Sequence, residues 1–102
     1  GEIVELPFDK LLLALGREAN TNGFGLETLG VETRKNGTLD CNGFMQTRFP
    51  NVYVCGDVTG PFQFTHVAAH QAWYAAVNAL FSGVKRFKVD YRVIPWVTFT
   101  DP

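Results

Sequence analysis

The sequence predicts an α/β fold, and three segments carry that prediction. Residues 52–55 read Val-Tyr-Val-Cys, a run of β-prone apolar residues that suits a short strand buried on both faces. Residues 11–15 form a second apolar run, which is typical of a central parallel strand, with a buried helix as the alternative. Residues 66–81 have the length and spacing of a helix. A strand, a loop and a long helix in this order are typical of an α/β domain.

Gly56 and Asp57 follow the expected strand at residues 52–55 directly. In open α/β sheets ligands bind at the carboxyl ends of the strands, and a glycine lets a ligand approach the backbone closely. A carboxylate at this position suits the diol of a ribose or ribitol. A simple turn without a ligand is the alternative interpretation of the Gly-Asp pair.

The helix expected after this turn has a small face and a bulky face. The small face is made of Phe64, Ala68, Ala72, Ala75 and Ala79. The bulky face is made of Ala69, Trp73, Val77 and Leu80. Alanines let the helix axis lie close to a sheet or a ligand, and bulky side chains need a packing partner, so both sides are predicted to be buried. Ser82 and Gly83 provide a stop.

The remaining elements are shorter. Residues 26–29 are expected to make one helical turn that a glycine ends. The Asn-Gly pair at residues 36–37 predicts a tight turn, after which residues 38–41 form one strand of a hairpin. A second Asn-Gly pair, at residues 42–43, predicts another turn. Residues 87–93 alternate apolar and polar, which predicts a half-buried extended segment.

Composition bounds the class of protein. The chain has 102 residues, of which 46% are hydrophobic and 19% charged, and this is the composition of one globular domain at most. The formal net charge of −1 provides no basic patch for nucleic acid or for a membrane surface. No apolar run approaches the roughly 20 residues that span a bilayer, and the start lacks the features of a signal peptide. We therefore expect a cytoplasmic protein.

A specific pattern surrounds the Gly-Asp turn. Residues 52–60 read Val-Tyr-Val-Cys-Gly-Asp-Val-Thr-Gly, and Thr65, Val67 and Ala68 follow. This pattern resembles the second flavin motif of the pyridine nucleotide-disulfide oxidoreductases. The resemblance implies a three-layer, Rossmann-like domain that binds FAD and NAD(P)H.

The same resemblance implies roles for individual residues. The Asp57 carboxylate would bind the ribitol of FAD, while the backbone around Thr65 and His66 would face the pyrimidine edge of the flavin. The cofactor-binding residues that it implies are Gly56, Asp57, Phe64, Thr65, His66 and Ala68. A physical reason stands beside it, since free N–H groups and the positive dipole end at a helix start favour an anionic reduced flavin.

Two further stretches resemble the same family. Gly16, Arg17 and Asn20 match a signature that joins the nicotinamide-binding domain to the flavin domain, although Ala19 replaces the usual proline. Residues 94–102 resemble the first strand of the carboxyl-terminal dimerisation domain. We therefore expect residues 1–93 to be the carboxyl-terminal part of the FAD/NAD(P)-binding region, cut short at both ends of the chain.

The chemistry-bearing motifs of the disulfide reductases are not in this sequence. It has no cysteine pair four residues apart, no first FAD-phosphate loop, no nicotinamide loop and no carboxyl-terminal His-Glu pair. We expect no catalytic residue here, and we expect Cys41 and Cys55 to be packing residues, with Cys55 in a buried strand. The helix entry at residues 63–69 resembles the mercuric-reductase-like subgroup more than the dihydrolipoamide dehydrogenases. The family's usual Glu-Gly is Gln71-Ala72 here, which puts an acidic contact to the flavin in doubt.

The sequence thus predicts a fragment of an FAD-dependent NAD(P)H oxidoreductase, with the remaining domains of the parent as partners and a homodimer as its assembly. His66 and His70 share a helix face, but without a third ligand we expect no metal site. One alternative is a flavoprotein without redox cysteines, of the NADH dehydrogenase or ferredoxin reductase type. Another is a non-catalytic α/β binding module.

Overall fold

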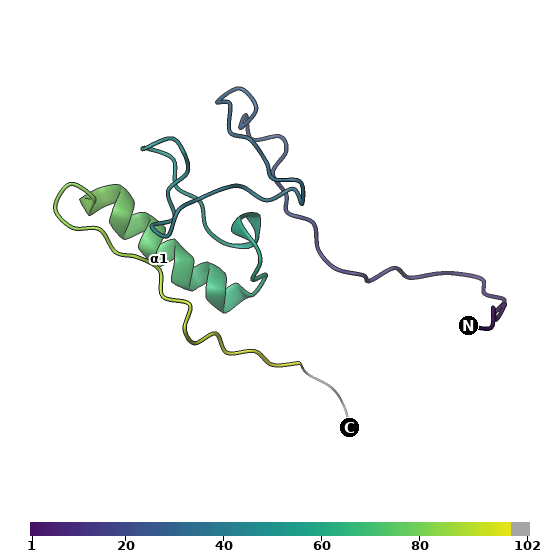
Figure 1. Ribbon diagram of the computed structural model, residues 1–102. Helices are drawn as coiled ribbons and strands as arrows, with labels where there is room; N and C mark the ends of the chain where they lie inside the picture. The colour runs from purple at the N-terminus through teal and green to yellow at the C-terminus, as the bar shows by residue number, and fades with distance from the viewer. Residues whose placement is uncertain (99–102) are drawn as a thin grey trace.

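A computed structural model describes residues 1–98 of the chain. Two helical elements occur in this range: the short 3-10 helix η1 (Asp57–Thr59) and the α-helix α1 (Thr65–Phe81). No β-strand forms among residues 1–98, and isolated antiparallel bridges take the place of a sheet. Figure 1 shows α1 as the one long regular element, with the preceding loops gathered on one side of it and the segment that follows it running back along the helix. Part of the expected dimerisation strand, residues 99–102, lies outside the described residues.

The expected strand at residues 52–55 pairs only locally. The Val54 N–H donates to the Met45 carbonyl at 2.9 Å, the Thr47 N–H donates to the Val52 carbonyl at 2.9 Å, and Tyr53 forms a bridge with Gln46. The prediction that this strand is buried on both faces is wrong. Residues 52–54 are half-buried, Cys55 is exposed, and no strand flanks them among residues 1–98.

The expected tight turns are confirmed. At residues 36–37, Gly37 has a φ of 78° and its N–H donates to the Arg34 carbonyl at 2.9 Å. Residues 38–41 meet the other arm of this turn through a single isolated bridge, Thr33 to Leu39, so the predicted hairpin strand does not form. At residues 42–43, the Asn42 side-chain oxygen holds the turn by accepting the Phe44 N–H at 2.9 Å.

Residues 11–15 do not form the central strand that was expected. Leu11, Leu12, Leu13 and Leu15 are between 65% and 91% exposed. Figure 1 shows the amino-terminal segment running away from the rest of the chain. The radius of gyration is 18.3 Å, against about 13 Å for a compact domain of this length. A strand needs hydrogen-bonding neighbours, and none lies beside this segment within residues 1–98.

Helix α1 begins after Phe64, whose backbone is extended, and ends at Phe81, with Ser82 as the cap. Its bounds agree with the prediction, but its buried face does not. The buried residues of α1 are Val67, Gln71, Ala75 and Asn78. Trp73 and Leu80 are 53% and 75% exposed, so the bulky face lacks the packing partner that was expected.

The core of the structure is small. Met45, Ala75 and Val89 are buried together, with three half-buried tyrosines packed around them. Residues 87–93 pass beside α1 as the half-buried segment that was predicted, with Val89 inward and its charged neighbours exposed. The Asn78 side chain fixes this segment, since it accepts from the Phe87 N–H and donates to the Phe87 carbonyl, both at 2.8 Å.

Candidate functional site

The turn before η1 has a conformation that requires glycine. Gly56 has φ 81° and ψ −156°, a region that is essentially closed to residues with a Cβ. It is buried, and a Cβ placed on it would lie 3.4 Å from the Ala68 Cβ in the first turns of α1. Gly56 therefore brings the backbone of this turn close to the start of α1, which joins two of the residues that the sequence placed at the cofactor.

Asp57 is the first residue of η1 and is half-buried. Its carbonyl accepts the Gly60 N–H at 3.2 Å, which closes the 3-10 turn. No hydrogen bond or ion pair to its carboxylate is found within residues 1–98. Since carboxylate oxygens can accept several hydrogen bonds, this side chain is available to bind hydroxyl groups of a ligand.

The start of α1 leaves backbone donors available. Phe64 is the residue before the helix, and no side chain caps the helix there. The first helical hydrogen bond runs from the Ala68 N–H to the Phe64 carbonyl. The amides of Thr65 and His66 precede that bond, and both residues are exposed. The rings of Phe64 and His66 stack with their centroids 5.4 Å apart. The arrangement presents N–H donors and the positive end of the helix dipole to a ligand.

The Gly-Arg signature lies against this same helix start. The Arg17 guanidinium donates to the Gln63 carbonyl at 3.0 Å, and the Gln63 amide donates to the Arg17 carbonyl at 3.4 Å. Ala19, which replaces the family's proline, is buried. Two motifs separated by more than forty residues in the sequence therefore meet at the entry of α1.

Gln71 holds the Gly56 turn, although the sequence pattern marks it only as a replacement of the family's usual glutamate. Its side-chain carbonyl accepts the Gly56 N–H at 2.6 Å, and its amide nitrogen donates to the Tyr91 hydroxyl at 2.8 Å. Apolar periodicity gives no signal for such a residue, because it counts a glutamine as a solvent-facing position.

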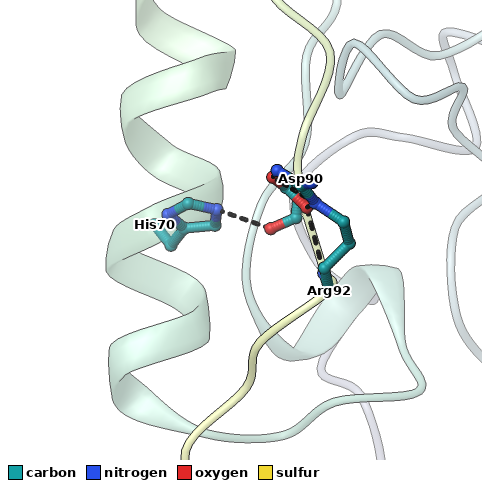
Figure 2. A network of polar contacts seen from close by, with 3 residues as sticks. All are labelled: His70, Asp90 and Arg92. Carbon is teal, nitrogen blue, oxygen red and sulfur yellow. Dashed lines mark hydrogen bonds and ion pairs between the residues drawn. The ribbon is translucent and has the colours of Figure 1, made fainter.

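His70 has a backbone partner. A ring nitrogen of His70 lies 3.1 Å from the Asp90 carbonyl oxygen, and Arg92 forms an ion pair with the Asp90 carboxylate at 2.6 Å (Figure 2). Hydrogen bonds from Arg92 lower the pKa of Asp90 from 3.8 to about 2. A cavity of about 220 Å³ lies between α1 and this segment. Nowhere in residues 1–98 do three or more His, Cys, Asp or Glu side chains gather to hold a metal ion.

Both cysteines are free thiols. Cys55 is exposed, so its expected place in a buried strand is wrong. Cys41 is half-buried and packs against the small core. Burial raises the pKa of the Cys41 thiol, which disfavours the reactive thiolate.

Comparison with known proteins identifies the family. The family model described as pyridine nucleotide-disulphide oxidoreductase matches residues 1–72. A mercuric reductase of Staphylococcus aureus is 44% identical over 94 residues, which is 92% of this chain and 17% of that protein. A dihydrolipoyl dehydrogenase of Chlamydia trachomatis is 40% identical over 95 residues, which is 93% of this chain and 20% of that protein.

The chain therefore belongs to the pyridine nucleotide-disulphide oxidoreductase family. A dihydrolipoyl dehydrogenase of Mycobacterium leprae is 38% identical over 102 residues, which is all of this chain and 22% of that protein. The chain thus spans about a fifth of the length of these curated relatives. In the described part of the chain, no helix is long and apolar enough to cross a membrane.

Proposed function

We propose that this chain forms the part of an FAD site that binds the ribitol and faces the flavin ring, within an FAD-dependent NAD(P)H oxidoreductase. Asp57 accepts hydrogen bonds from ribitol hydroxyls, and the amides of Thr65 and His66 donate to the pyrimidine edge of the ring. When bound, FAD supplies the redox chemistry, and the residues of this chain bind and orient it.

One observation carries the proposal: Gly56 places the Asp57 turn against the first turns of α1. A carboxylate acceptor and uncapped helix donors then belong to one local unit, joined by the contact between Gly56 and Ala68. A flavin nucleotide fits this donor set, since its ribitol carries hydroxyl donors and its reduced ring carries negative charge. Membership of the pyridine nucleotide-disulphide oxidoreductase family supports a cofactor of this class.

The wider assembly is also proposed. In the parent protein, the exposed leucines of residues 11–15 would join a parallel sheet in a three-layer, Rossmann-like domain. Residues 94–98 would lead into a dimerisation domain, and the parent would be a homodimer. The exposed apolar side chains on both segments favour such burial.

The experiment is an absorbance spectrum of the purified parent protein, followed by anaerobic addition of NADH or NADPH. We expect the spectrum of a bound oxidised flavin, which bleaches as the nicotinamide nucleotide reduces it. A parent protein that folds, lacks flavin as purified and does not take up added FAD would contradict the proposal.

A further inference from the structure

We propose that Gln71 is a positioning residue: its buried side-chain amide fixes the Gly56 turn and thereby the direction in which Asp57 meets the cofactor. The inference rests on the function proposed above. The residue that fixes the conformation of the Gly56 turn thus lies on helix α1, in its second helical turn.

Gln71 is 1% exposed, and its polar atoms are used on both sides. The carbonyl oxygen accepts the Gly56 N–H at 2.6 Å, the shortest contact that this side chain makes. The amide nitrogen donates to the Tyr91 hydroxyl at 2.8 Å. Because a donor and an acceptor are fixed at opposite ends of the amide, its orientation is defined, and the oxygen faces the turn.

The contact matters because of where Gly56 lies. The N–H that bonds Gln71 belongs to Gly56, the residue immediately before Asp57. Gly56 has a backbone conformation that only glycine adopts without strain. Glycine alone leaves several conformations accessible, so a buried partner is needed to select this one. The Thr59 hydroxyl, which has one proton, bonds the Gly56 carbonyl at 2.9 Å and makes only a secondary contact with Gln71 at 3.3 Å.

Tyr91 supports the amide from behind. The centroid of its ring lies 5.7 Å from the centroid of the Phe62 ring, and its hydroxyl oxygen lies 3.9 Å from the Met45 sulfur. Burial raises the pKa of the Tyr91 hydroxyl, so it keeps its proton, which points to the Met45 sulfur while its oxygen accepts from Gln71. The chain of contacts runs from the core through Tyr91 and Gln71 to the turn that carries Asp57.

Asn78 provides a matched control on the same face of α1. It is 0% exposed, like Gln71 it is a buried amide, and it bonds Phe44 and Phe87 rather than the turn. Replacing either amide by an apolar side chain of similar size leaves buried backbone groups without partners and lowers stability. Only the change at Gln71 releases the Gly56 N–H.

The test compares Gln71→Met, Gln71→Glu, Tyr91→Phe and Asn78→Leu in the parent protein. Two quantities are measured: the dissociation constant for FAD in the apo-protein, and the exchange rate of the Gly56 amide hydrogen without FAD. Gln71→Met should weaken FAD binding about tenfold and speed the exchange of that amide about tenfold, the effect of losing one buried hydrogen bond. Tyr91→Phe should change both in the same direction by a smaller factor.

Gln71→Glu keeps an acceptor for the Gly56 N–H, so its FAD affinity should stay within about threefold of the original. Asn78→Leu should melt at a lower temperature but bind FAD as the original does. Equal FAD affinity in Gln71→Met, or an equal loss in Asn78→Leu, would overturn the positioning role. If the unaltered parent binds no FAD, the proposed function fails instead, and unchanged Gly56 exchange in Gln71→Met would overturn the positioning role separately.

Discussion

At the scale of single residues, Gly56 is the position on which the site depends. The sequence indicated a glycine that lets a ligand approach, and the structure adds a second demand, because φ 81° with ψ −156° excludes side chains. Asp57 follows it directly as the first residue of η1. The orientation of the carboxylate thus follows from a backbone conformation that a single methyl group would strain.

Gly56→Ala should lower the free energy of unfolding by about 1–3 kcal/mol, the cost of forcing an alanine into this conformation. The added methyl would meet Ala68 at an ordinary contact distance of 3.4 Å, so strain rather than collision dominates. Denaturant unfolding of the parent measures the change. Gly83→Ala is the control, because Gly83 has open space around it and no positive φ, and it should change stability by less than about 1 kcal/mol.

The two cysteines differ in exposure and should differ in reactivity. In the 102-residue chain, a thiol reagent at neutral pH should modify Cys55 before Cys41, because Cys41 is half-buried and its thiol pKa is raised. Mass spectrometry of labelled peptides gives the order. Replacing both by serine should leave the oxidoreductase activity proposed for the parent largely intact, and loss of activity at constant flavin content would show that one of them takes part in the chemistry.

At the scale of elements, helix α1 was predictable and the strands were not. The bounds of α1 follow from local signals, an extended Phe64 before it and Ser82-Gly83 after it. Its buried face was mispredicted, since two of its inward residues are Gln71 and Asn78, whose burial depends on partners distant in the sequence. A strand depends on neighbours even for its hydrogen bonds, so residues 52–55 and 11–15 could not be placed from their own composition.

The position of the candidate site along the chain was predictable to a similar degree. The Gly56-Asp57 turn and the helix start are contiguous motifs, and the structure brings them into contact through Ala68, while their role in binding FAD stays a prediction. The contacts that hold these two segments in place were not predictable, because Gln71 and Arg17 bond residues far away in the chain. Their roles follow from geometry that only the folded chain defines.

The segment beside α1 has a pH-dependent contact. Arg92 holds the pKa of Asp90 at about 2, below its ordinary 3.8. Because the pKa is lower in the folded state, this contact contributes stability above pH 3.8, and the contribution is lost as the pH falls from 3.8 through about 2. Arg92→Ala should return the Asp90 pKa toward 3.8, as followed by NMR titration of the carboxyl group. An unchanged low pKa in that variant would assign the shift to another cause.

At the scale of the whole molecule, the chain is extended for its length. Its principal dimensions are 62 × 38 × 24 Å, and large apolar side chains are exposed along the amino-terminal segment and on α1. Exposed apolar surface of this kind marks sites of contact with other protein segments. Together with coverage of about a fifth of the relatives' length, this favours a site that is completed by further parts of a larger protein.

The isolated 102-residue chain should therefore bind FAD weakly or not at all. A loop at a helix start, of the kind that binds the pyrophosphate of dinucleotides, is not in this sequence, so the contacts that it would make with the pyrophosphate are missing here. Fluorescence titration of the purified chain with FAD measures the affinity. Submicromolar binding would show that the cofactor lies elsewhere than proposed.

The role of Asp57 is the central claim, and the FAD affinity of an Asp57→Ala parent tests it most directly. A lost hydrogen bond to a charged group costs about 1.5–3 kcal/mol, which is roughly ten- to more than a hundredfold in affinity. Apo-protein melting is recorded beside it, and Glu32→Ala, which removes an exposed acid outside the turn, is the control. For Asp57→Ala we expect weaker FAD binding with little change in melting temperature, and for Glu32→Ala we expect unchanged FAD binding. Unchanged FAD affinity in a well-folded Asp57→Ala protein would contradict the proposed site.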